Sequence, residues 1–143
     1  MFERYTENAR RAFHFAREEA VRYRSPSIES EHLLLGILRE SEALATRIGG
    51  EMGSVKSLRE EIEAKINIGP PVTGSPEVPV SADSKQILFL AADEAKHLGH
   101  RRIALGHFLL GILRLDRCFA ARILQAHGAT ILAMREEALR WGG

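Results

Sequence analysis

Two octapeptides decide the fold of this 143-residue chain: residues 32–39 read HLLLGILR, and residues 107–114 read HFLLGILR. Extending this register along the chain aligns residues 16–20 with 91–95, and it needs no gap between Thr6/Ser81 and Glu61/Glu136. We call this register, in which residue 32 stands on residue 107, the repeat alignment. A repeat of this length is a complete folded unit, because solenoid repeats span only about 20 to 50 residues. We therefore expect two similar lobes related by a pseudo-twofold axis. Any site in one lobe should have a counterpart in the other.

Apolar residues recur at helical spacing, and no stretch shows the alternation of a strand. Thr6 is placed to cap the first helix, and Ser54 the fourth, while Gly49-Gly50 should end the third. The sequence therefore predicts an all-α domain of eight helices in two pseudo-twofold-related four-helix repeats. The expected helices span about residues 7–22, 30–39, 42–48, 55–67, 82–98, 105–114, 116–126 and 130–141.

Residues 68–80 contain four of the five prolines and two glycines, a composition that continues no helix. We therefore expect one domain over residues 1–143, made of repeat 1 (6–67), a linker (68–80) and repeat 2 (81–141).

Most of the positions that the two repeats share are expected to be structural. Gly36 should let a second helix approach closely, and His32 and His107 should bond a nearby backbone group or carboxylate at a helix start. Cys118 is expected to be a small core residue, and the Arg-Glu-Glu runs at 59–61 and 135–137 to be solvated faces. The leucines expected in the core are Leu34, Leu35, Leu38, Leu109, Leu110 and Leu113.

Composition excludes several classes of function. The net charge of +1 is too small for a non-specific nucleic-acid binder, and no apolar run approaches the length of a membrane span. A single cysteine and the absence of a secretory signal favour a reducing cytoplasm. No Walker A, nucleophile-elbow, zincin or paired-cysteine motif is present, and the histidines lack zinc-like spacing. We therefore expect a binding module rather than an enzyme, with no metal or cofactor and no binding of ATP.

Six stretches carry a recognisable pattern: residues 2–9 (FERYTENA), 16–20 (AREEA), 28–38 (IESEHLLLGIL), 91–95 (AADEA), 98–100 (LGH) and 107–113 (HFLLGIL). Together they resemble the amino-terminal domain of ClpC-type Clp ATPases. This resemblance implies a module that recruits substrate or adaptor proteins to a Clp ATPase ring or protease complex. It also implies recognition of phosphoarginine by a Glu just before the repeat histidine, which is Glu31 here, with Thr6 helping to hold the phosphate.

The second repeat departs from that pattern, because Gly106 stands where the family has Glu. Ser81 keeps a hydroxyl, and Lys85 is available to an anion, so we expect a degenerate second site and a single phosphoarginine site in repeat 1. The Gly49-Gly50 pair also departs from the family, which leaves adaptor contacts in that region open.

Three functions remain open from the sequence. The chain is the recruiting domain of a Clp unfoldase, a stand-alone accessory subunit that docks on and modulates a Clp protease complex, or an enzyme or nucleic-acid binder that reuses the fold. A Walker A motif in the reading frame beyond Gly143 would select the first, and the missing catalytic motifs disfavour the third.

Overall fold

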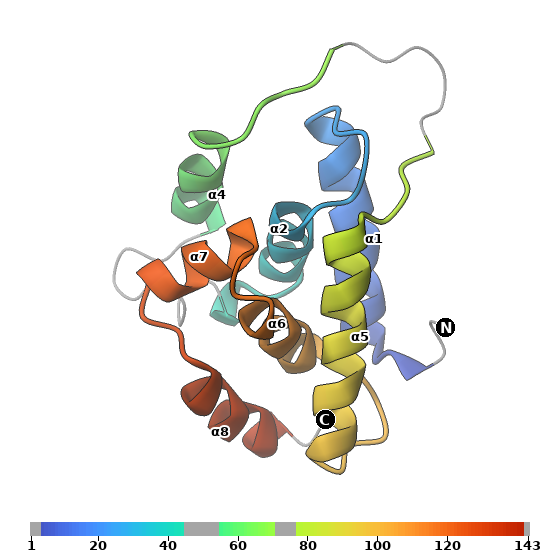
Figure 1. The fold of residues 1–143 in the computed structure, drawn as a ribbon, viewed down its shortest axis with the longest axis vertical. Coiled ribbons are helices and arrows are strands. Elements are labelled where there is room, and N and C mark those ends of the chain that lie inside the picture. Colours follow the sequence, from blue (N-terminus) through green and yellow to red (C-terminus); the bar gives the residue numbers. More distant parts are fainter. Residues whose placement is uncertain (1–3, 45–54, 71–76, 142–143) are drawn as a thin grey trace.

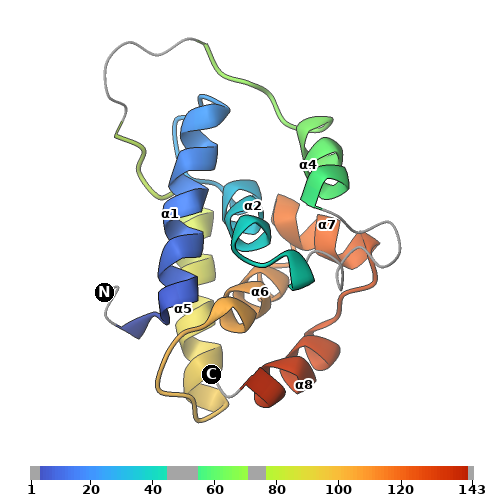
Figure 2. The same cartoon turned by 180° about the vertical axis from the view of Figure 1, so that it is seen from behind.

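The structure is a computed structural model that describes residues 4–44, 55–70 and 77–141. Every regular element in these residues is a helix, and the only extended pairing is two isolated bridges. Residues 42–44 are also helical, so the described residues contain eight helical segments and the predicted all-α class is confirmed (Figures 1 and 2). The helices are α1 (Glu7–Arg22), α2 (Ser30–Glu40), α4 (Val55–Glu63), α5 (Ala82–His97), α6 (Leu105–Arg114), α7 (Phe119–Ala126) and α8 (Ile131–Trp141).

Several predicted features lie outside the described residues. These are the end of the third helix at Gly49-Gly50 and the Ser54 cap of the fourth helix. The fourth helix itself, α4, ends at Glu63, earlier than the expected end near residue 67. The boundaries of the two repeats and the linker stay a prediction.

The helix caps explain where α1, α5 and α7 begin. The hydroxyl oxygens of Thr6 and Ser81 accept hydrogen bonds from the backbone N–H groups of Ala9 and Ser84, at 3.2 and 3.1 Å. Helix α7 begins at Phe119 rather than near residue 116, because the Sγ atom of Cys118 caps it by accepting from Ala121 N at 3.4 Å. Cys118 is buried, as expected, but its capping role was missed.

Two backbone bridges show the pseudo-twofold relation directly. Tyr5 pairs with Ile103, and Val80 pairs with Ile28. In the repeat alignment Tyr5 stands on Val80 and Ile28 on Ile103, so the two bridges are equivalent. The flanking hydrogen bonds match: Thr6 N donates to Ile103 O at 3.0 Å, and Ser81 N donates to Ile28 O at 3.1 Å. Each bridge joins one repeat to the other, so the start of α1 lies beside the segment leading into α6, and the start of α5 beside the segment leading into α2.

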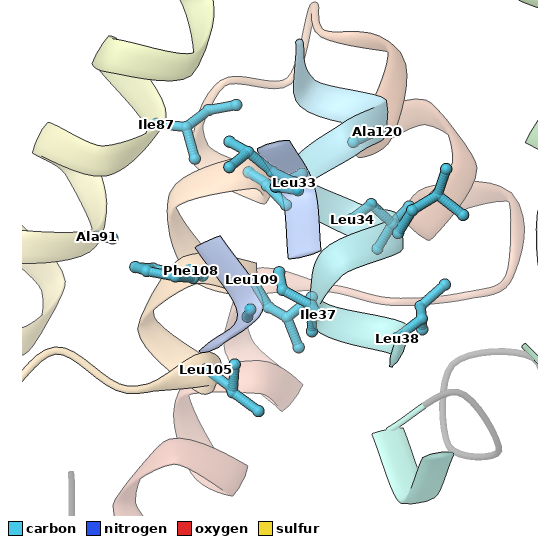
Figure 3. Close-up of a cluster of buried hydrophobic side chains, with 14 of the residues drawn as sticks. Leu33, Leu34, Ile37, Leu38, Ile87, Ala91, Leu105, Phe108, Leu109 and Ala120 are labelled. Atoms are coloured by element: carbon cyan, nitrogen blue, oxygen red, sulfur yellow. The ribbon is translucent and has the colours of Figure 1, made fainter. Parts of the chain in front are cut away.

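Helices α2 and α6 supply the centre of the core. Figure 3 shows Leu33, Leu34, Ile37 and Leu38 of α2 in one cluster with side chains of α5, α6 and α7. All six leucines expected in the core are buried. Burial of such side chains is the dominant favourable term in folding.

Gly36 and Gly111 allow these central helices to cross their neighbours closely, as the sequence predicted for Gly36. A Cβ atom at Gly36 would lie 2.2 Å from the carbonyl oxygen of Ala12 in α1, and one at Gly111 would lie 2.4 Å from that of Ile87 in α5. Both obstacles are backbone atoms, so no side-chain rotation can remove the overlap.

We expect Gly36→Ala to lower the free energy of unfolding by about 1–3 kcal/mol, because α2 must move away from α1 and the core loses contacts. Chemical denaturation followed by far-UV circular dichroism measures this. Gly128→Ala is an informative comparison, since a Cβ at Gly128 meets nothing within 4 Å and its cost comes from the positive φ of 86°. An unchanged unfolding midpoint for Gly36→Ala would contradict the close crossing.

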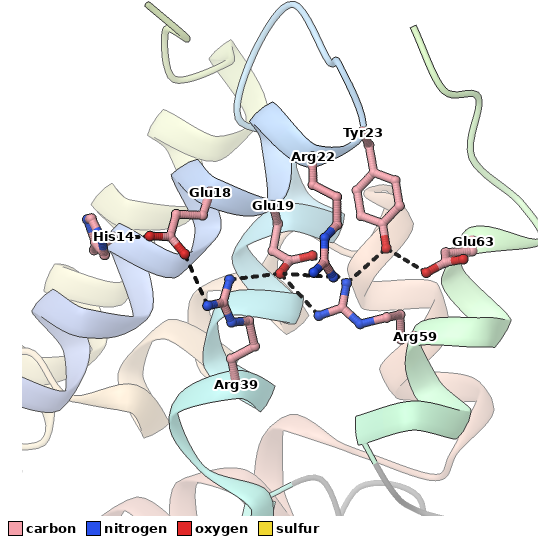
Figure 4. Close-up of polar contacts among 8 residues, drawn as sticks. All are labelled: His14, Glu18, Glu19, Arg22, Tyr23, Arg39, Arg59 and Glu63. Atoms are coloured by element: carbon pink, nitrogen blue, oxygen red, sulfur yellow. Dashed lines mark hydrogen bonds and ion pairs between the residues drawn. The ribbon is translucent and has the colours of Figure 1, made fainter. Parts of the chain in front are cut away.

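A buried carboxylate in α1 ties three helices together (Figure 4). Glu19 is 0% exposed, and its Oε2 atom accepts hydrogen bonds from Arg39 Nη1 of α2 at 3.0 Å and from Arg59 Nη2 of α4 at 3.1 Å. Arg59 also donates to the hydroxyl of Tyr23 at 2.9 Å, and Tyr23 donates in turn to Glu63 at 2.7 Å. The network therefore anchors α4, which buries only Leu58 and Ile62 against the core.

Repeat 2 contains the same arrangement around Glu94. Arg114 and Arg135 lie within 3.4 and 2.7 Å of its Oε1 atom. Arg114 stands on Arg39 in the repeat alignment, but Arg135 lies one position beyond the residue that stands on Arg59. The gap-free alignment is therefore wrong for the last helix of each repeat. The expectation of a solvated face is also wrong for Arg59, whose side chain is 17% exposed and binds a buried carboxylate. Arg135 binds one too, but its side chain stays 42% exposed.

Candidate functional site

The start of α2 is organised by His32. Its Nδ1 atom accepts a hydrogen bond from Glu29 N at 2.8 Å, and His107 Nδ1 accepts in the same way from Ala104 N at 2.8 Å at the start of α6. This confirms the structural interpretation of the repeated histidine. Burial lowers the pKa of each imidazole to about 4, so both rings are neutral acceptors near pH 7.

Glu31 lies in the first turn of α2 and is half-buried. Burial raises the pKa of its carboxyl group, and the charge of Glu29 adds to that shift. No cation among the described residues forms an ion pair with Glu31, in contrast to Glu19 and Glu94. A half-buried carboxylate that lacks an ion-pair partner is only partly hydrated, which favours binding of a cationic group from outside the chain.

Ser81 and Lys85 lie on the Glu31 side of the molecule. Ile28, just before Glu31 in the chain, is bonded to Pro79 and Ser81 through the bridge at the start of α5, and Figures 1 and 2 both show this segment passing that helix start. Lys85 is exposed and lies one turn after Ser81, on the same face of α5. We call Glu31, Ser81 and Lys85 the Glu31 site.

Thr6 lies at the other end of α1. This helix has 16 residues and is therefore about 24 Å long, and the His32 ring beside Glu31 stacks on Tyr23 at the far end, with ring centroids 6.4 Å apart. Thr6 is instead bonded to Ile103, just before Gly106 in the chain. The bridges therefore put the segment leading into α2, the helix of Glu31, beside the start of α5, the helix of Ser81 and Lys85, and put Thr6 beside the segment leading to Gly106. The family resemblance had grouped Glu31 with Thr6.

The second combination is the Gly106 site, made of Gly106, Thr6 and Arg10. Arg10 occupies in α1 the position that Lys85 occupies in α5, and sequence reasoning did not single it out. The signal for it was the repeat alignment itself, which pairs Arg10 with Lys85. Both sites thus have a capping hydroxyl and a cation, but only the Glu31 site has a carboxylate.

The described residues contain neither a metal-binding cluster nor a membrane-spanning helix. Among residues 4–44, 55–70 and 77–141, no group of three or more His, Cys, Asp or Glu side chains is placed to hold a metal ion. The helices in the same residues are too short or too polar to cross a bilayer.

The comparisons with known proteins agree with this architecture. The family profile described as "Clp repeat (R) N-terminal domain" matches residues 4–127. The chain belongs to the Clp N-terminal domain family. The resemblance predicted from the sequence is therefore confirmed.

Relatives of this Clp N-terminal domain are much longer proteins. The chain is 36% identical over 141 residues to the chaperone protein ClpB of Oceanobacillus iheyensis, covering 98% of this chain and 17% of that protein. It is 33% identical over 141 residues to the Bacillus subtilis protein named negative regulator of genetic competence ClpC/MecB, again covering 98% and 17%. The chain therefore spans about a sixth of the length of these relatives.

Solved structures show the same fold. The N-terminal domain of the chaperone ClpD from Arabidopsis thaliana is similar with a TM-score of 0.78 and 26% identity, covering 100% of this chain and 97% of that one. The Hsp104 N-terminal domain from Candida albicans gives a TM-score of 0.72 at 18% identity over 97% of this chain and 91% of that one, a likeness of fold alone.

Proposed function

We propose that this domain is a protein-binding module that recruits substrate or adaptor proteins to a Clp unfoldase or protease complex, and that it recognises phosphoarginine at the Glu31 site. The observation that carries the proposal is that the backbone bridge of Ile28 puts the segment leading to Glu31 beside the start of α5, which carries Ser81 and Lys85, while no cation in the described part of the chain pairs with Glu31. Family membership supports the general role in Clp systems.

The chemistry of phosphoarginine requires both kinds of group. Its guanidinium part is planar and matches the two oxygens of a carboxylate such as Glu31. Its phosphoryl part carries about −1.5 to −2 charges, by analogy with other phosphorylated residues. The N-terminus of α5, with the Ser81 hydroxyl and the Lys85 ammonium, offers the donors and positive charge that a phosphoryl group needs. The Gly106 site lacks the carboxylate, so we expect one phosphoarginine site per chain.

Calorimetric titration with free phosphoarginine tests this proposal. We expect a stoichiometry near one, loss of binding in Glu31→Ala, and weaker binding in Glu31→Gln, which keeps one acceptor but loses the charge. A hydrogen bond to a charged partner contributes about 1.5–3 kcal/mol, which corresponds to about ten- to a hundredfold in affinity.

The matched variant for the second site is Gly106→Glu, which introduces the missing carboxylate and should raise the stoichiometry toward two. Tight binding that survives Glu31→Ala, or two equivalent sites in the unmodified chain, would contradict the assignment. A pull-down from lysate, with and without free phosphoarginine as competitor, would then identify the recruited proteins.

The remaining features of the proposed role follow from the same chemistry. We propose that the domain works in the cytoplasm with a Clp ATPase ring or protease complex, without nucleic acid, membrane or cofactor. It should neither bind nor hydrolyse ATP, because its sequence contains no Walker A motif.

A further inference from the structure

The Gly106 site is bordered by exposed arginines. Two flank Thr6 along the chain, and the other two lie in the loop just before α6. Backbone bonds hold these segments together, since Ile103 N donates to the residue-4 carbonyl at 2.9 Å, and the residue-10 N–H donates to Thr6 O at 2.9 Å. We call this the arginine surface: Arg4, Arg10, Arg101 and Arg102.

The guanidinium groups of the arginine surface have no side-chain partner in the part of the chain that the structure describes. Within the described residues none of them forms an ion pair or a side-chain hydrogen bond, whereas Arg11 binds Glu40 at 2.8 Å and Arg39 binds Glu18 at 3.0 Å. The nearby carboxylate of Glu7 is 82% exposed and lies 3.6 Å from Arg11. Each unused guanidinium keeps a fork of N–H donors that suits a carboxylate.

The pseudo-symmetric counterpart of this surface has a different charge. In the repeat alignment three of its arginines stand on Pro79, Pro26 and Ser27, which leaves only Lys85 as a cation. The carboxylates differ in the opposite sense, because Glu29 and Glu31 correspond to an alanine and a glycine before His107. The two related sites therefore differ in charge: carboxylates predominate at the Glu31 site, whereas at the other site four arginines outnumber the exposed carboxylate of Glu7.

We propose that the arginine surface, with the Gly106 site at its centre, is a second binding site of this domain that takes an acidic segment of a partner protein. Asp and Glu side chains of such a segment would bind the arginine forks, while the missing carboxylate at residue 106 removes a group that would repel them. The site is independent of Glu31 and of phosphoarginine.

The charge of the chain favours an acidic protein segment over a nucleic acid. The net charge is only +1, which is too small for the non-specific binding of a phosphate backbone along a basic surface. A short run of carboxylates requires only a local cluster of cations.

The test is fluorescence anisotropy of a labelled short polyglutamate peptide with the whole chain, at low and at physiological salt. We expect saturable binding that weakens with salt, no binding of the polyglutamine analogue, and about five- to tenfold weaker binding by the double variant Arg101→Gln/Arg102→Gln. The matched control is Lys65→Gln/Arg122→Gln, which removes the same charge at exposed positions elsewhere.

Three outcomes would overturn the proposal. They are no binding of polyglutamate, equal loss of affinity in the two double variants, or tighter binding of a single-stranded oligonucleotide or an anionic lipid vesicle than of the peptide. Glu31→Gln should leave peptide binding unchanged, so the failure of this site and the failure of the phosphoarginine site are distinguishable.

Discussion

Lowering the pH from 6.5 to 4 should reduce the free energy of unfolding by about 3 kcal/mol for each of His32 and His107. Both imidazoles are buried and neutral in the folded chain, where burial lowers their pKa to about 4, while an unfolded histidine has a pKa of about 6.5. Between these values the unfolded chain binds more protons than the folded chain, so stability falls as the pH falls. The charges facing His32 are those of Glu29 and Glu19, and His107 faces His100 and Glu94.

Chemical denaturation at a series of pH values measures this loss. The double variant His32→Gln/His107→Gln should have a flatter profile between pH 6.5 and 4, because Gln at this position of a capping box still accepts from the backbone but does not titrate. His14→Gln is the control, since His14 is 63% exposed. A profile that the double variant leaves unchanged would show that these histidines are not the titrating groups.

Glu19→Ala should lower the free energy of unfolding by about 3–5 kcal/mol, because it leaves the guanidinium groups of Arg39 and Arg59 without their buried partner. Burial alone would raise the pKa of Glu19, but the hydrogen bonds from Arg59 and Arg39, together with the charges of Arg59 and Arg22, outweigh it and lower that pKa. A carboxylate with a lowered folded pKa stabilises the fold above its unfolded pKa, and this contribution is lost as the pH falls through the folded value.

Glu18→Ala is the matched control for Glu19→Ala. The Glu18 side chain is 48% exposed and also binds Arg39, at 3.0 Å, so it shares a helix and a partner with Glu19 but not its burial. An exposed ion pair of this kind contributes about 0–1 kcal/mol. Equal losses of unfolding free energy in the two variants would mean that the Glu19 network does not anchor α4.

The repeat made the fold predictable. Core leucines, Gly36, the Thr6 cap and the helix-start histidines follow from patterns within about one turn of helix, where spacing and residue type are enough. The ion pair of Arg59 and the capping role of Cys118 were missed, because both depend on atoms brought close only by packing. In repeat 2 the arginine that binds Glu94, Arg135, lies one position later than the repeat alignment predicts. Nothing in the sequence indicates this shift, because the Arg-Glu-Glu runs look like solvated surface.

The residues proposed for the site came from the sequence, but their grouping came from the structure. An internal alignment shows which positions are equivalent, so it assigned Glu31 and Thr6 to one repeat and Ser81 to the other. It does not show which helix starts meet, because the bridges run between repeats. Ile28 and Ile103 are equivalent in the repeat alignment, but the sequence does not show that Ile28 pairs with Val80 and Ile103 with Tyr5. Only that pairing shows which helix starts meet.

The most direct test of the composite Glu31 site is calorimetric titration of phosphoarginine into Lys85→Gln and Thr6→Ala, each checked for folding by circular dichroism. Lys85→Gln should weaken binding by about tenfold or more, since it removes a charged donor to the phosphoryl group, and Thr6→Ala should leave the affinity unchanged. Loss of binding in Thr6→Ala together with full binding in Lys85→Gln would contradict the account.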